Sequence, residues 1–222
     1  MKALVLLSTY LFISATNTYA APSPKNDQSY PVINGCEIKP ETVCPHVDLS
    51  NTNLRHADLR NAVLTGANLA GADLRHAVLT NVDAKGANFQ GANLARVDLR
   101  HADIRGANLQ QANLMAITGW AMFAQGANFN DANLQGANID FARFSKASLH
   151  RANLTAANLE MVWFSKADLY QANLTNATLQ EAKLNDANLA EANLTGTRIH
   201  YATFQSTYME GCTNCPFDWQ KP

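Results

Sequence analysis

Residues 57–71 read Ala-Asp-Leu-Arg-Asn-Ala-Val-Leu-Thr-Gly-Ala-Asn-Leu-Ala-Gly, and small and apolar side chains return in this stretch every five positions. The same period continues from residue 47 to residue 206 without a break in frame. Of 32 consecutive five-residue blocks, 24 have Ala at the first place and 29 have Leu, Ile or Phe at the third. An uninterrupted period of this kind predicts a solenoid, in which successive coils of the chain stack on one another.

The composition of each place predicts which side chains point inward. The first and third places are small or apolar, whereas the second, fourth and fifth are mostly polar. Inward side chains recur every 3.6 residues in a helix and every 2 residues in a strand. A period of five residues fits neither, and favours short extended segments with a corner after each. At the second place, 21 of 32 residues are Asn or Asp, whose side chains bond nearby backbone groups and stabilise turns.

The pattern Ala-(Asn/Asp)-Leu-X-X resembles that of the pentapeptide-repeat family, over about 160 of the 222 residues. The resemblance implies an all-β fold, a right-handed quadrilateral β-helix of about 8 coils with four blocks per coil. Residues 20 apart then stack in columns, and at about 4.8 Å per coil the rod is about 38 Å long. One column of third-place residues is entirely leucine and is the predicted spine of the core: Leu54, Leu74, Leu94, Leu114, Leu134, Leu154, Leu174 and Leu194.

The chain divides into four predicted segments. Residues 1–20 have a basic start, an apolar run and small residues before position 21, which is typical of a secretory signal peptide. Residues 21–46 are predicted to be a flexible segment followed by a disulfide cap, 47–206 the β-helix, and 207–222 a C-terminal cap. No later apolar run is long enough to cross a bilayer. We therefore expect an exported protein without a transmembrane segment, in the bacterial periplasm or secreted.

The four cysteines lie at the two ends of the predicted rod, Cys36 and Cys44 before the repeats and Cys212 and Cys215 after them. An oxidising compartment favours disulfides, and four cysteines allow three pairings. A disulfide requires Cα atoms within about 7 Å, which excludes the two pairings that join opposite ends of the rod. We predict Cys36–Cys44 and Cys212–Cys215. A redox role for the Cys212-Thr213-Asn214-Cys215 sequence is the alternative.

Both ends are predicted to block addition of a further coil, because an open strand edge invites end-to-end association. Pro31, Pro40 and Pro45 cannot extend a hydrogen-bonded ladder, and Phe217 and Trp219 can cover the C-terminal opening.

The charges and motifs exclude several classes of function. With 17 Lys and Arg against 18 Asp and Glu, the net charge is −1, and Asp and Arg recur two residues apart, close enough to neutralise each other. We therefore expect no nucleic-acid partner. No nucleophile motif, phosphate-binding loop or pair of buried carboxylates is present, which predicts a non-enzymatic protein without a cofactor. His56 and His76 stack in one column and are candidate metal ligands, or simply surface residues.

The repeat changes character at residues 115–124, where the Asn and Asp residues disappear and Gly119 and Ala124 occupy third places. Ile117 and Met122 replace the usual Ala and are expected to fill the vacated volume. The same columns then place large side chains at outward positions. These form a predicted protein-binding strip along one edge, comprising Trp120, Phe123, Phe141, Arg143, Met161, Trp163, Lys183 and Tyr201. The alternative is that aromatic and cationic stacking there only stabilises the ladder.

Three functions follow as hypotheses. The first is an exported scaffold that binds an unidentified protein, or forms a homodimer, through this strip. The second comes from the family resemblance, since some pentapeptide-repeat proteins resemble duplex DNA and modulate type II topoisomerases. The third is binding of a metal or small ligand at His56 and His76.

Overall fold

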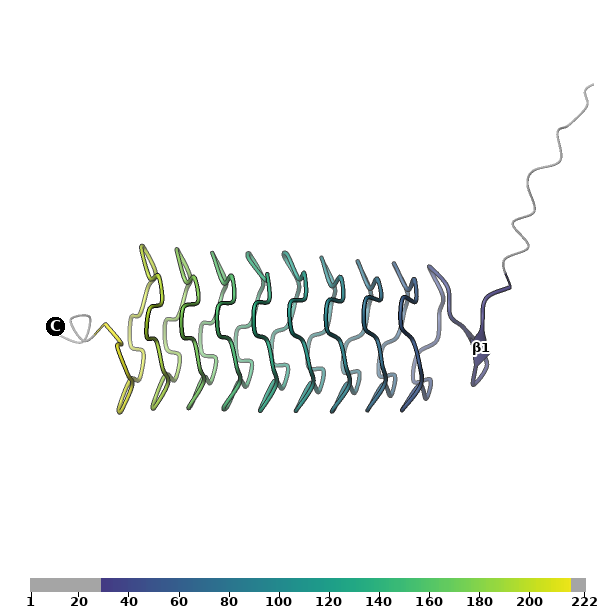
Figure 1. The fold of residues 1–222 in the computed structure, drawn as a ribbon, viewed down its shortest axis with the longest axis horizontal. Helices are drawn as coiled ribbons and strands as arrows, with labels where there is room; N and C mark the ends of the chain where they lie inside the picture. Colours follow the sequence, from purple (N-terminus) through teal and green to yellow (C-terminus); the bar gives the residue numbers. More distant parts are fainter. Residues whose placement is uncertain (1–28, 217–222) are drawn as a thin grey trace, which may run out of the picture.

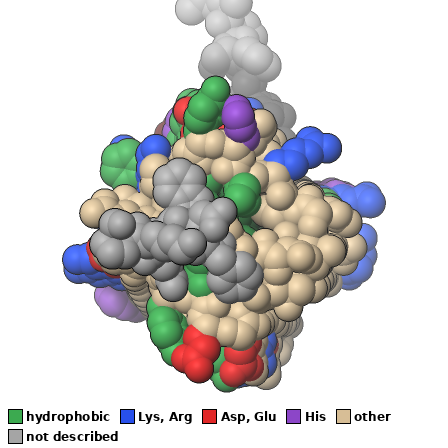
Figure 2. All heavy atoms as spheres, turned by 90° about the vertical axis from the view of Figure 1, so that its left-hand side faces the viewer, with side chains coloured by type: hydrophobic (Ala, Val, Ile, Leu, Met, Phe, Trp, Pro, Cys, Tyr) green, Lys and Arg blue, Asp and Glu red, His purple; other side chains and the backbone are tan. Residues whose placement is uncertain are grey.

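The computed structural model describes residues 29–216, which form an elongated right-handed quadrilateral β-helix (Figure 1). Seen from its C-terminal end, the rod has a four-sided outline (Figure 2). The predicted signal peptide and the aromatic residues Phe217 and Trp219 lie outside the described residues. Within residues 29–216 no helix is long and apolar enough to cross a membrane.

Parallel bridges join each second-place residue to the residue 20 positions later, from Val43↔Val63 to Asn193↔Thr213. Four five-residue blocks therefore make one coil, as the family resemblance implies. Each bridge is supported by backbone hydrogen bonds, such as Leu134 N–H to the Asn153 carbonyl at 2.7 Å. These contacts are short and regular, and they fix the spacing between coils along the described rod.

The corners are tight turns between the third place of one block and the first place of the next. Ala57 N–H donates to the Leu54 carbonyl at 3.1 Å, and His56 between them has a φ of 59°. This positive φ recurs at the fifth place of the blocks and is the region that glycine adopts most easily. Second-place side chains also support the turns, as expected, because Ser50 N–H donates to Asp48 Oδ1 at 3.0 Å.

The core is a continuous column of first- and third-place side chains. The predicted leucine spine is buried along its whole length, with Leu54 and Leu194 the most exposed at 2%. At the irregular block, a Cβ on Gly119 would lie only 3.0 Å from Met122 Sδ and from Ile139 Cγ2. Met122 therefore occupies the space beside Gly119, as the sequence predicts, and Ile117 is buried with it.

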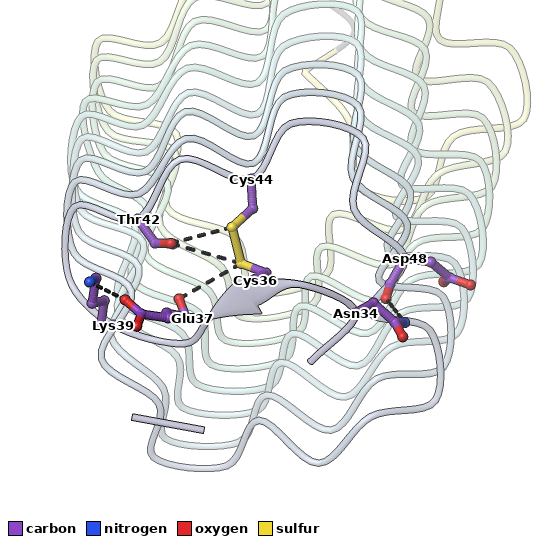
Figure 3. The surroundings of a disulfide bond; sticks show 7 residues. All are labelled: Asn34, Cys36, Glu37, Lys39, Thr42, Cys44 and Asp48. Atoms are coloured by element: carbon purple, nitrogen blue, oxygen red, sulfur yellow. Dashed lines mark hydrogen bonds and ion pairs between the residues drawn. A yellow bond between two sulfur atoms is a disulfide. The ribbon is translucent and has the colours of Figure 1, made fainter. Parts of the chain in front are cut away.

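A small antiparallel hairpin lies at the N-terminal end of the rod, formed by β1 (Val32–Ile33) and β2 (Cys36–Glu37). Cys36 in β2 is paired with Cys44, with their Cα atoms 5.8 Å apart (Figure 3). Thr42 lies beside this disulfide, its Oγ1 3.3 Å from Cys44 Sγ. Cys36 and Ile38 are buried against the core, so the hairpin covers apolar side chains at this end.

At the other end Cys212 is paired with Cys215, again with Cα atoms 5.8 Å apart. Both cysteines are buried and belong to the apolar core. The last parallel bridge ends at Thr213, one residue after Cys212. The two disulfides thus lie at the two ends of the bridged ladder, and their role as caps against end-to-end association stays a prediction.

Candidate protein-binding edge

The large outward side chains of the predicted strip come from adjoining columns on either side of one corner of the rod. Their positions follow from the bridges Asp103↔Phe123, Phe123↔Arg143 and Arg143↔Trp163, which stack second-place residues directly. Fifth-place residues across the corner stack in the same way, because they share the 20-residue period. Trp120, Phe141 and Trp163 expose 39%, 44% and 52% of their surface. Three large aromatic side chains are therefore exposed together at this corner of the rod.

These side chains line a hollow of about 270 Å³, together with His101 and Ala121. The hollow has a simple origin in the fifth-place column, which runs His101, Ala121, Phe141. Ala121 has only a methyl group, so a gap remains between the larger side chains before and after it. Trp120 closes one side, with its ring in edge contact with His101 at 4.7 Å and with Phe141 at 6.1 Å between centroids.

Arg143 forms another wall of the hollow and is held between two aromatic rings. Its Cζ atom lies 5.0 Å from the Phe123 ring centroid and 5.5 Å from the Trp163 centroid. Such cation–π contacts stabilise exposed side chains by about 0.5–1 kcal/mol each. Among the described residues Arg143 forms no ion pair, whereas Arg60, Arg75, Arg100, Arg105 and Arg151 each contact a carboxylate.

The structure brings together five of the eight residues that the sequence assigns to the strip. Trp120, Phe123, Phe141, Arg143 and Trp163 line the hollow. Met161, Lys183 and Tyr201 continue the same columns toward the C-terminal end and do not line it. Tyr201 is 72% exposed and its ring lies against that of His200, with 3.8 Å between the centroids and 52° between the ring planes. Sequence reasoning missed His101 and Ala121, although both occupy the fifth-place column that contains Phe141.

Other faces of the rod carry columns of hydrogen-bonded polar side chains and several ion pairs. In one column of second-place residues, each Asn Nδ2 donates to the side chain one coil earlier at 3.0–3.3 Å, through Asp48, Asn68, Asn88, Asn108 and Asn128. The predicted Asp–Arg pairs also form, as between Arg75 and Asp73. The hydrogen bond from Arg75 lowers the pKa of Asp73 to about 2, so this carboxylate is ionised at neutral pH.

The two candidate metal ligands, His56 and His76, stack face to face with their ring centroids 5.2 Å apart. Both are exposed on a corner of the rod. Across residues 29–216, no group of three or more His, Cys, Asp or Glu side chains is arranged to hold a metal ion.

The comparison with known families agrees with this geometry. The family described as "Pentapeptide repeats (8 copies)" matches residues 46–81, 77–115, 123–151, 132–171 and 172–211. These matches cover most of the chain, which therefore belongs to the pentapeptide-repeat family. No match was found among curated protein sequences.

Several solved structures are similar to the chain. HetL, a pentapeptide repeat protein involved in heterocyst differentiation regulation in the cyanobacterium Nostoc sp. strain PCC 7120, is 26% identical, with 78% of this chain and 89% of HetL covered and a TM-score of 0.43. QnrB1, a plasmid-mediated fluoroquinolone resistance protein, is 15% identical, with 76% and 93% covered and a TM-score of 0.46. A thylakoid-lumen pentapeptide repeat protein of Arabidopsis thaliana is 26% identical, with 63% and 66% covered and a TM-score of 0.18.

Proposed function

We propose that this protein is a non-catalytic binding rod that acts outside the cytoplasm and holds a partner protein against the edge formed by Trp120, Phe141 and Trp163. The observation that carries the proposal is the exposure of three large aromatic side chains around one hollow. Complete burial of such a side chain is worth roughly 1.5–3 kcal/mol, so a few of them dominate an interface.

The structure of the repeat itself supports an interaction role for these side chains. Asp83 and Asp103 occupy earlier positions of the column that contains Trp163, so the coil forms equally well with a small polar residue there. Trp163 also lies outside the core, which is filled by first- and third-place residues. Coil packing therefore does not require an indole at this position.

A partner of different sequence fits the edge better than a second copy of the chain. A two-fold contact centred on the hollow would bring two Arg143 guanidinium groups together. Within the described part of the chain neither Arg143 nor Lys183, two coils later in the same column, has a carboxylate partner, so the like charges would be unscreened. Such juxtaposition opposes association.

The two disulfides support a location outside the cytoplasm, because the cytoplasm is reducing and disfavours structural disulfides. The paired Asp and Arg side chains support a protein partner over the imitation of DNA, whose surface is a continuous array of unpaired negative charge.

The test compares Trp163→Asp with Tyr208→Asp in quantitative capture of partners from an envelope fraction. Tyr208 is a matched control, since it is 53% exposed and its column contains Asp48 and Asp168. We expect Trp163→Asp to lose the captured protein and Tyr208→Asp to retain it, with both variants folded by circular dichroism. Light scattering on the purified protein reports a homodimer, if one forms. Unchanged capture and unchanged mass in Trp163→Asp would refute the proposal.

A further inference from the structure

The hollow beside Arg143 combines aromatic walls with one cation that has no carboxylate partner among the described residues, and this combination defines the chemistry of what it binds. We propose that it receives an acidic side chain of an extended peptide segment, with an adjacent aromatic or aliphatic side chain packed against Trp120 and Phe141. The inference rests on the proposed function and specifies the partner's chemistry at the same edge.

The position of the guanidinium supports this role. The Arg143 guanidinium lies over the rings of Phe123 and Trp163, with Cζ 5.0 and 5.5 Å from the ring centroids. Within residues 29–216 the Arg143 guanidinium donates no hydrogen bond to another side chain or carbonyl, so its N–H donors are available to a ligand. Two flanking rings also restrict the side chain before any ligand arrives, which lowers the entropic cost of binding. A carboxylate matches such a fork of donors through two parallel hydrogen bonds.

The surrounding charges leave this position open to an acid. Among residues 29–216, Asp103 in the same column is already paired with Arg105 and Lys85. Asp140 and Glu160 occupy the same fourth-place column as Trp120, and neither forms an ion pair with Arg143. Arg151 provides the contrast, because its guanidinium is engaged by Asp131 with N–O distances of 2.7 and 2.9 Å.

The size of the hollow and its single cation favour a peptide over single-stranded nucleic acid. A volume of about 270 Å³ accommodates one or two side chains. Nucleic acid binding requires a groove of basic residues that follows the phosphate backbone, in addition to aromatic rings on which bases stack. Here the basic side chains two and three coils before Arg143, Arg105 and Lys85, are bound to Asp103 and Asp83, which interrupts any such groove.

The experiment measures binding of two capped peptides, acetyl-Gly-Glu-Phe-Glu-Gly-amide and its analogue with Gln in place of Glu, by titration of tryptophan fluorescence. An oligothymidylate of ten nucleotides serves as a third probe. With the wild-type protein we expect the Glu peptide to bind about tenfold more tightly than the Gln peptide, as a charge-assisted bidentate contact predicts. Raising the salt concentration should reduce this ratio.

Two variants distinguish the contribution of the Arg143 charge to binding from that of the hollow itself. Arg143→Gln should bring the ratio of the dissociation constants of the two peptides close to one, while leaving the affinity for the Gln peptide unchanged. Ala121→Phe should abolish binding of both, because it fills the hollow without removing any group. Phe141 has the same positive φ as Ala121, 59° against 56°, so the backbone there accepts phenylalanine. Ala156→Phe is the matched control on another corner, with a φ of 56°, and should bind like wild type.

The inference is overturned if the two peptides bind equally, if neither binds, or if Arg143→Gln keeps the preference for Glu. Tighter binding of the oligothymidylate, lost in Arg143→Gln, would replace the peptide with a nucleic acid and also overturn it. Its failure is distinguishable from failure of the proposed function. If Trp163→Asp loses a captured partner while Arg143→Gln keeps it, the binding edge stands and the acidic ligand does not.

Discussion

The substitution Leu134→Ala tests the assignment of inward and outward places most sharply. Leu134 is fully buried in the leucine spine, with Leu114 and Leu154 in the coils on either side. The change removes three carbon atoms, which at about 0.8 kcal/mol each amounts to about 2.4 kcal/mol of lost transfer free energy.

A cavity term adds to this figure because the coils cannot close around the vacated space. Leu134 N–H bonds to the Asn153 carbonyl, and Leu114 N–H to the Asn133 carbonyl, both at 2.7 Å. These bonds hold neighbouring coils at a fixed separation. We therefore expect the free energy of unfolding to fall by about 3–5 kcal/mol, the upper part of the range for such substitutions.

Asn193→Ala is the matched outward change. Asn193 Oδ1 accepts hydrogen bonds from Thr195 N–H at 3.0 Å and Thr195 Oγ1 at 2.6 Å, both exposed to water. Loss of these bonds should cost about 1 kcal/mol. The assay is denaturant unfolding of both variants, followed by circular dichroism. A larger loss for Asn193→Ala than for Leu134→Ala would refute the assignment of places.

Three further predictions concern the corners, the charges and the ends. Gly136→Val should lower the free energy of unfolding, measured with denaturant, by about 1–2 kcal/mol, and Gly136→Asn should lower it by less. The cost comes from the backbone, because φ is +63° and a Cβ at this position would meet no atom within 4 Å. The pKa of Asp73 is about 2, below its unfolded value of about 3.9, so its contribution to stability is present above about pH 4 and is lost as the pH falls toward 2. Unfolding curves between pH 2 and 7 should show this fall, smaller in Asp73→Asn, and an equal fall in both would contradict it. Peptide mapping without reduction should recover Cys36–Cys44 and Cys212–Cys215, and a link between the two pairs within one chain would contradict the rod.

The sequence predicts the coil because its constraints are local and repeated. Each third-place Leu must be buried, and the four-block coil that the family resemblance implies aligns Leu114, Leu134 and Leu154 in one column. The same period is enough to place Phe123, Arg143 and Trp163 in one outward column. Once the resemblance supplies the length of the coil, column membership, and with it most of the candidate edge, follows from counting residues.

The backbone conformation of the corners was not predicted from the sequence, although a signal for it was present. The Asn and Asp residues at the second place suggest that the turns depend on their side chains. The structure assigns the positive φ to the fifth place instead, where Gly66, Gly86 and Gly106 occur and no Val, Ile or Thr is found. Exclusion of β-branched residues is the expected consequence of a left-handed conformation.

The hollow could not be predicted from columns alone, because it depends on a residue that is small. A search for large outward side chains does not select Ala121, yet the small size of its methyl group leaves the space between His101 and Phe141. The position of Arg143 between two rings likewise depends on side-chain rotamers, which a repeat pattern does not specify.

Hydroxyl-radical footprinting of the native protein tests the binding edge most directly, since it reports burial of the edge whatever the partner is. Oxidation of Phe141, Trp163 and Tyr208 is measured by mass spectrometry in the intact envelope fraction and again after purification. Trp163 and Tyr208 are almost equally exposed in the isolated chain, at 52% and 53%. The proposed edge predicts that Phe141 and Trp163 are protected in the envelope fraction and oxidised after purification, with Tyr208 oxidised in both. Equal oxidation of Trp163 in the two samples would contradict it.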